Sequence, residues 1–163
     1  MTTKPKAIIV DLDGTIADLR HRLHLVKYRP RTPHTWNEFF DQCSKDTPHE
    51  HICELLRALQ GVRIIIVSGR PDSHRQVTIW WLRVVAKVPF DELHMRVAGD
   101  RTPDRVIKRH ILEHLRKEYE IILAIDDRPS VIRMWKEEGV PVLDMCSEDW
   151  DEEEAKESCY AAP

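Results

Sequence analysis

Short runs of apolar residues recur at long intervals along the chain and predict a buried sheet. The clearest runs cover residues 7–10, 62–67, 120–125 and 140–145, and a shorter run at 93–98 is a further candidate strand. Ile and Val stand at consecutive positions in these runs, which is typical of parallel strands that are covered on both faces. Segments with helical spacing lie between the runs, at 50–60, 72–88, 102–119 and 128–139. This alternation predicts an α/β fold with a doubly wound parallel sheet and right-handed crossovers.

Residues near the ends of the expected helices fit their positions. Thr102 is the expected N-cap of the helix over 102–119, with Pro103 at the first helical position. In the helix over 50–60 the apolar residues predict one buried face, and Gly61 is the expected cap that follows it. The members of that face are Ile52, Leu55, Leu56 and Leu59.

Residues 19–50 fit the alternation of strands and helices poorly. We expect a small helical insertion there, after the first strand and over one edge of the sheet. The sequence has no internal repeat and no low-complexity linker, so residues 1–146 are expected to form one domain without a large cap domain. The acidic residues at 147–163 are expected to be a mobile C-terminal tail.

Composition narrows the class of protein. A chain of 163 residues suits one domain with a sizeable core, and its apolar runs are too short to span a membrane. The four cysteines form no C-x-x-C pair, which favours reduced thiols and a cytoplasmic location.

The net charge of −3 conceals a basic block at residues 20–31. The cations of this block are Arg20, Arg22, Lys27, Arg29 and Arg31, with no acid among them. Such a block is either a solvated face or a patch that binds a polyanion. Tyr28 and Trp36 lie in the same insertion and either stack on a base or pack in the core.

Polar residues follow three of the predicted strands. The first strand leads into DLDGT at 11–15, the second into SGR at 68–70, and a later one into DDR at 126–128. Sites in open parallel sheets form beyond the carboxyl ends of the strands, so these segments are expected to meet at one edge. All of them carry groups that can bind a metal or a phosphate.

The order of these motifs resembles the haloacid dehalogenase superfamily, most of whose members are magnesium-dependent phosphoryl-transfer enzymes. The resemblance implies Asp11 as the nucleophile, Asp13 as the acid and base, and Lys108 as the cation that stabilises the developing charge. It further implies the phosphate-binding residues Thr15, Ser68 and Gly69. The implied Mg²⁺ ligands are Asp11, Asp13 through its main-chain carbonyl, Asp126 and Asp127.

Elementary chemistry supports that assignment. A phosphomonoester dianion repels a carboxylate nucleophile, so attack needs a cation, and Mg²⁺ prefers oxygen ligands. Adjacent acids such as Asp126 and Asp127 repel each other unless a cation lies between them, although a plain acidic turn is the alternative. Lys108 could instead form a surface pair with Asp104, four residues earlier, and that acid could also orient the lysine at the site.

Two longer stretches, 97–112 and 120–140, are similar to the phosphatase domain of the phage polynucleotide kinase–phosphatases, which remove 3′-phosphates from DNA or RNA ends. That similarity implies phosphate-binding roles for Arg22, eleven residues past Asp11, and for Arg70, and a supporting role for Asp104. The alternative for both arginines is an exposed surface position.

The leading hypothesis is therefore a magnesium-dependent phosphatase of polynucleotide 3′-ends that acts in end repair. The chain has no G-x-x-x-x-G-K-[ST] motif, so it is expected to work alone or beside a separate kinase or ligase. The alternative is a phosphatase of free nucleotides or other small phosphoesters. A binding protein without catalytic activity is a third hypothesis, and the intact set of motifs argues against it.

Overall fold

Five parallel strands form the centre of the structure, a computed structural model that describes residues 3–146. The strands are β1 (Lys6–Val10), β4 (Arg63–Pro71), β5 (Glu92–Arg96), β6 (Glu120–Asp126) and β7 (Val142–Asp144). Their order across the sheet is β5-β4-β1-β6-β7, and every neighbouring pair is parallel. The predicted doubly wound α/β fold is confirmed, and β1 lies at its centre.

Both faces of the central strands are buried, which explains the unbroken apolar runs. Ile8 and Val10 of β1 belong to one hydrophobic cluster, whereas Ile9 belongs to a second cluster on the opposite face. Successive side chains of a strand point to opposite faces, so a strand covered on both sides needs apolar residues at every position. Each fully buried Ile contributes about 1.5–3 kcal/mol of transfer free energy relative to water.

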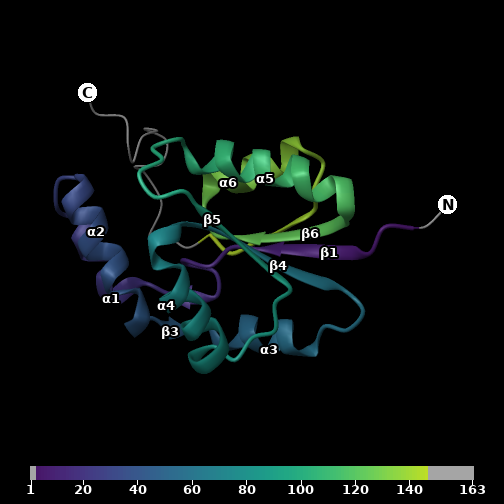
Figure 1. Cartoon of the computed structure of the whole chain (residues 1–163), viewed down its shortest axis with the longest axis horizontal. Coiled ribbons are helices and arrows are strands. Elements are labelled where there is room, and N and C mark those ends of the chain that lie inside the picture. The colour runs from purple at the N-terminus through teal and green to yellow at the C-terminus, as the bar shows by residue number, and fades with distance from the viewer. Residues whose placement is uncertain (1–2, 147–163) are drawn as a thin grey trace.

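Helices cover the two faces of the sheet (Figure 1). The helices on one side are α3 (Glu50–Ala58) and α4 (Arg75–Trp80), and those on the other are α5 (Asp104–Glu118) and α6 (Pro129–Glu137). A short 3₁₀ turn, Asp72–His74, precedes α4, and one π-helical turn, Trp81–Val85, follows it. Together these elements provide the cover that the parallel sheet requires.

The insertion lies beyond the carboxyl ends of the strands, at the left of Figure 1. It contains α1 (Arg20–Lys27), α2 (Pro33–Asp41) and the 3₁₀ turn Cys43–Lys45, so the expectation of short helices is confirmed. Two short strands, β2 (Ala17–Asp18) and β3 (Thr47–Pro48), pair antiparallel and close its base.

A small hydrophobic cluster holds the insertion together. Its buried members are Leu19, Leu23, Val26, Trp36, Phe39 and Phe40. The rings of Trp36 and Phe39 meet edge to face with their centroids 5.4 Å apart. Trp36 is therefore a packing residue and not a base-stacking one, whereas Tyr28 is 78% exposed.

Several local expectations need correction. Helix α5 begins at Asp104, so Pro103 is its N-cap and Thr102 lies outside it. Helix α3 ends at Ala58, and Gly61 lies in the following turn with a φ of +71°. Leu55 faces solvent, because the buried stripe of α3 runs instead through Ile52, Cys53 and Leu56.

The remaining expectations concern the acidic tail, the cysteines and the location of the protein. The acidic tail at 147–163 lies outside the described residues. Cys43, Cys53 and Cys146 are free thiols within residues 3–146. No helix in that part of the chain is long and apolar enough to cross a membrane, and the cytoplasmic location stays a prediction.

Candidate active site

The carboxyl ends of β1, β4 and β6 bring the polar segments together, as their spacing predicts. Val10 is in register with Ile66 on one side and with Ile125 on the other, so the residues that follow these three positions lie side by side. The main-chain N–H of Asp11 then donates to the carbonyl of Ile125 at 2.9 Å. The residues that follow each strand therefore face one shared space.

Lys108 lies at the centre of a buried group of acids. Its Nζ donates to Asp11 Oδ1 at 2.6 Å and to Asp126 Oδ2 at 2.8 Å, and it lies 3.5 Å from Asp104 Oδ2. Burial alone would lower the pKa of Lys108, but attraction to Asp11, Asp126 and Asp104 raises that pKa well above its ordinary value. The lysine is therefore a permanent cation at the site and not a surface residue.

Burial shifts the pKa of Asp11 in the direction opposite to that of Lys108. Burial raises the pKa of Asp11 well above its ordinary value, and repulsion from Asp126, Asp127 and Asp104 adds to the effect of burial. The ammonium of Lys108 opposes the increase without cancelling it. A further positive charge near these carboxylates would lower the pKa of Asp11 and favour its ionised form.

The same acids fit a metal ion. One carboxylate oxygen from each of Asp11, Asp126 and Asp127 lies within 4.8 Å of the others, and all three residues are buried. Hard oxygen ligands of this kind suit Mg²⁺. Lys108 contacts two of these carboxylates, Asp11 and Asp126, and a bound cation would further reduce the repulsion within the group.

Gly14 allows Asp127 to approach the first strand's turn. A Cβ at Gly14 would lie 1.9 Å from Asp127 Oδ2, and the φ of +91° is one that other residues rarely adopt. Thr15 is buried beside it and donates from Oγ1 to Asp127 Oδ1 at 3.4 Å. The structure thus places Thr15 against the metal-site acid, and its phosphate contact stays a prediction.

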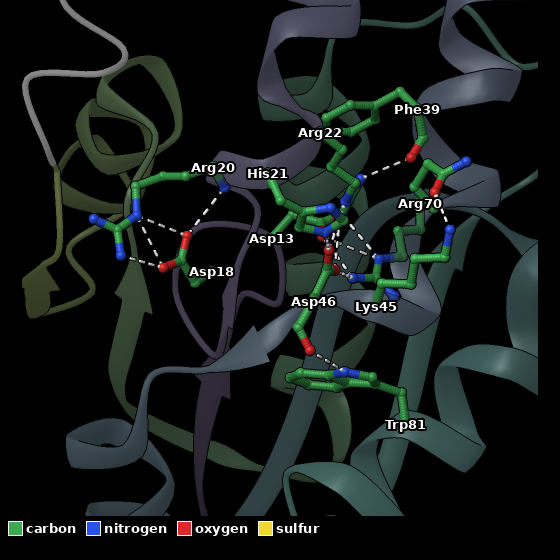
Figure 2. Close-up of polar contacts among 11 residues, drawn as sticks. Asp13, Asp18, Arg20, His21, Arg22, Phe39, Lys45, Asp46, Arg70 and Trp81 are labelled. Atoms are coloured by element: carbon green, nitrogen blue, oxygen red, sulfur yellow. Dashed lines mark hydrogen bonds and ion pairs between the residues drawn. The ribbon is translucent and has the colours of Figure 1, made fainter.

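The side chain of Asp13 points into a different group (Figure 2). Arg70 donates to it from Nε at 2.9 Å and from Nη2 at 2.6 Å, and Arg22 donates from Nη2 at 2.5 Å. Burial would raise the pKa of Asp13, but Arg70 and Arg22 together hold it well below its ordinary value. Asp13 therefore lies with the arginines, and its main-chain carbonyl as a metal ligand stays a prediction.

Both arginines are fully buried, so the alternative of exposed surface positions is wrong. The guanidinium of Arg22 lies 4.0 Å from the centre of the Phe39 ring, and its Nη1 donates to the Phe39 carbonyl at 3.3 Å. Helix α2 of the insertion thus fixes a side chain of the site. Both Arg22, on α1, and the Phe39 that supports it, on α2, therefore belong to the insertion.

Asp46 is a site residue that the sequence analysis missed. Its carboxylate accepts from Arg22 Nε at 2.7 Å and from Arg70 Nη2 at 2.7 Å. Trp81 Nε1 donates to its main-chain carbonyl at 2.8 Å and holds it in place. A polar segment without pattern surrounds Asp46 in the sequence, so the available signal was indirect: two buried arginines need a second acid.

Asp104 lies beside both Lys108 and Gly69. Asp104 lies 3.5 Å from Lys108 Nζ and also accepts from Arg96 Nη2 at 3.2 Å, an arginine that the sequence analysis missed. A Cβ at Gly69 would come within 2.8 Å of Asp104 Oδ1, so a side chain there would displace this acid. Ser68 is buried next to it, and its Oγ accepts from the N–H of Arg70 at 3.2 Å.

Ion pairs engage much of the basic block. Arg20 donates to Asp18, Arg29 pairs with Glu38, and Arg31 Nε donates to the Val26 carbonyl at 3.2 Å. The acidic partners of Arg20 and Arg29 offset part of the positive charge of the block. Arg22 is the member of the block that belongs to the site.

The comparison with known families decides what this site belongs to. Residues 5–150 match the family described as the polynucleotide kinase PNKP phosphatase domain. The chain belongs to this family. The haloacid dehalogenase resemblance is thereby confirmed, and the PNKP phosphatase domain is a phosphoric monoester hydrolase. The match also covers the whole set of site residues described above.

Individual relatives agree with the family. The chain is 26% identical over 147 residues to an inferred bifunctional polynucleotide kinase/RNA ligase of Autographa californica nuclear polyhedrosis virus, covering 87% of this chain and 20% of that protein. It is 28% identical, with a TM-score of 0.73, to a chain in the structure of the Pnkp1/Rnl/Hen1 RNA repair complex, covering 88% of this chain and 43% of that one. This chain thus spans about a fifth of the length of the viral relative and less than half of the length of the chain in the repair complex.

A class C acid phosphatase from Bacillus anthracis shares the fold at 18% identity and a TM-score of 0.64, covering 91% of this chain and 69% of that one. Such a distant likeness shows the shared architecture of the sheet and its helices.

Proposed function

We propose that this PNKP phosphatase domain removes the 3′-phosphate from polynucleotide ends, with Mg²⁺ as its cofactor. The observation that carries the proposal is the division of the site into two groups, one around Asp11 and Lys108 and one around Asp13, Arg22 and Arg70. The first suits attack on phosphorus, and the second suits the phosphate oxygens and the leaving group. The polynucleotide substrate is supported by the kinase/ligase relative and by the RNA repair complex.

In the first step, an Asp11 carboxylate oxygen attacks phosphorus and the bond from phosphorus to the 3′-oxygen breaks. The product is an aspartyl-phosphate, and Asp13 gives a proton to the departing 3′-oxygen. Lys108 stabilises the negative charge beside Asp11. A Mg²⁺ ion held by Asp11, Asp126 and Asp127 would neutralise charge on the phosphate oxygens.

In the second step, Asp13 takes a proton from a water molecule that attacks the same phosphorus. The bond from phosphorus to Asp11 breaks, and phosphate and the free carboxylate result. Asp13 thus ends the cycle protonated, with a proton from water in place of the one that left on the 3′-oxygen.

The arginines must change partners for this cycle to begin. Asp13 is ionised between Arg22 and Arg70, whereas proton donation needs its acid form. An incoming phosphate supplies the anion that both guanidiniums prefer, and its negative charge raises the pKa of the adjacent Asp13. We therefore propose that substrate binding loosens these ion pairs and lets Asp13 take up a proton.

The test compares phosphate release from a 3′-phosphorylated oligonucleotide, the same oligonucleotide with a 5′-phosphate, and 3′-mononucleotides, each with Mg²⁺ and with EDTA. The proposal expects the 3′-phosphorylated oligonucleotide to have the highest kcat/KM and EDTA to stop the reaction. Higher kcat/KM for mononucleotides would instead favour a small-molecule phosphatase. A kinase and a ligase, on this polypeptide or beside it, are the partners that we propose.

A further inference from the structure

The buried ion-pair network of Asp13, Arg22, Asp46 and Arg70 reaches solvent at a narrow edge. The side chains of Arg22, Asp46 and Arg70 have no exposed area, whereas 18% of the Asp13 side chain is exposed. His21 joins the network from helix α1 and is 37% exposed, as Figure 2 shows above Asp46. Asp13 and His21 are therefore the members of this network that solvent can reach.

The hydrogen bonding of His21 determines which ring nitrogen is available. Its Nε2 lies 2.8 Å from Asp46 Oδ1, and the same oxygen accepts from Arg22 Nε. A carboxylate held by two guanidiniums is an acceptor, so Nε2 carries the hydrogen and donates. Among the residues that the structure describes, no group bonds to Nδ1, on the other side of the ring.

We propose that His21 Nδ1 contacts the leaving nucleotide and makes His21 a specificity-determining residue for polynucleotide ends. The inference rests on the proposed function, in which Asp13 faces the departing 3′-oxygen. The atoms next to that oxygen are the sugar and its neighbouring phosphodiester, and in this proposal they lie against the two solvent-accessible members of the network, Asp13 and His21. A neutral Nδ1 accepts from a sugar hydroxyl, and a protonated Nδ1 donates to a phosphodiester oxygen.

A purely structural role for His21 makes a different prediction. If His21 only held Asp46, its loss would disturb Arg22 and Arg70 and would slow the hydrolysis of every phosphoester. His21→Gln separates the two roles, because a glutamine amide can still donate to Asp46 but has no counterpart of Nδ1. His21→Ala removes both interactions.

The experiment measures kcat/KM on a 3′-phosphorylated ribo-oligonucleotide, its deoxy counterpart and p-nitrophenyl phosphate. It uses the wild type, H21Q, H21A and the control H34A, whose histidine is 78% exposed on α2 and pairs with Glu38. The melting temperature of each variant is recorded first. We expect H21Q and H21A to lose about tenfold on oligonucleotides, the usual effect of one hydrogen bond, and H21Q to stay within about twofold on p-nitrophenyl phosphate. H34A should match the wild type.

Either pattern among oligonucleotides supports the contact: a loss confined to the ribo form indicates the 2′-hydroxyl, and an equal loss on both forms indicates the phosphodiester. Wild-type activity of H21Q on oligonucleotides, or equal losses of H21Q on oligonucleotides and p-nitrophenyl phosphate, would overturn this proposal alone. A wild-type enzyme that hydrolyses p-nitrophenyl phosphate but no oligonucleotide would overturn the proposed substrate, and His21 would lose its role with it.

Discussion

Asp11 and Asp13 are separated by one residue, yet their side chains enter opposite electrostatic environments. Asp11 shares a pocket with Asp126, Asp127 and a single lysine, Lys108, and its pKa is raised. Asp13 lies between two arginines, and its pKa is lowered. Burial raises the pKa of both carboxyls, and the two arginines around Asp13 reverse that effect, whereas the charges around Asp11 do not.

The balance of charge in the two groups explains their different needs. The pocket of Asp11 holds more carboxylates than cations, and a bound cation would complete it. The group around Asp13 pairs two arginines with Asp13 and Asp46 and is neutral by itself. The charges of the Asp11 pocket therefore suit a metal cation. The arginines of the Asp13 group suit an anion that can replace a carboxylate as their partner.

The largest expected effect comes from removing the charge of Asp11. Asp11→Asn should lower kcat by about a thousandfold or more, because an amide oxygen cannot form the covalent intermediate. Activity is measured on p-nitrophenyl phosphate, and circular dichroism checks the fold. The matched control is Asp41→Asn, whose carboxylate is 67% exposed and contacts His74. Residual activity above a tenth of the wild type would assign the nucleophile to another residue.

Asp46→Asn tests whether the second group is balanced as described. The change leaves Arg22 and Arg70 with Asp13 as their one acid in this network, so we expect a loss of about 3 kcal/mol of unfolding free energy. Activity should fall about a hundredfold, since the orientation of both arginines depends on Asp46. Urea unfolding and kcat/KM measure the two effects. Wild-type values for both would remove Asp46 from the site.

Metal binding should stabilise the Asp11 pocket and leave the Asp13 group unaffected. A ligand that binds only the folded state adds about 2.7 kcal/mol at a hundred times its dissociation constant. We therefore expect Mg²⁺ to raise the melting temperature of the wild type and of Asp46→Asn by several degrees, but not that of Asp126→Asn. An equal increase in Asp126→Asn would place the metal elsewhere.

The smallest expected effects are those of Asp11→Asn and Asp13→Asn on the unfolding free energy of the metal-free protein. These two effects should have opposite signs. A raised pKa in the folded state adds stability below about pH 4 that is lost as the pH rises, so Asp11→Asn should stabilise the protein at pH 7. A lowered pKa adds stability above about pH 4 that is lost on acidification, so Asp13→Asn should destabilise it at pH 7. We expect about 1 kcal/mol in each direction.

Urea unfolding in EDTA between pH 4 and pH 8 measures this difference. The difference between Asp11→Asn and the wild type should shrink as the pH falls toward 4, whereas that of Asp13→Asn should persist across this range and be lost only below about pH 4. A shift of both variants in the same direction at pH 7 would show that the two environments are not electrostatically opposite.

Some features of the protein were predictable from local sequence because they depend on local physics. Unbroken Ile and Val runs indicate strands covered on both faces, and polar residues directly after three such runs must meet where parallel strands end. Asp11 and Asp126 could therefore be placed at one edge of the sheet from the sequence, whereas Lys108, on a helix, was assigned to the site through the resemblance to the haloacid dehalogenase superfamily. The helical insertion was predictable as a break in this alternation. Which of its residues reach the site was not predictable from that break.

Only the tertiary structure decided the partners of Asp13. Asp46 is far from both arginines in sequence, and the fold of the insertion brings its carboxylate to them. Trp81, from the turn that follows α4, donates to the main-chain carbonyl of Asp46. Adjacent Trp80 and Trp81 likewise differ, with Trp81 buried and Trp80 48% exposed, because the packing of the helix decides which one faces the core. Strand ends follow from the periodicity of one segment, whereas charge pairing depends on segments that meet only when the chain is folded.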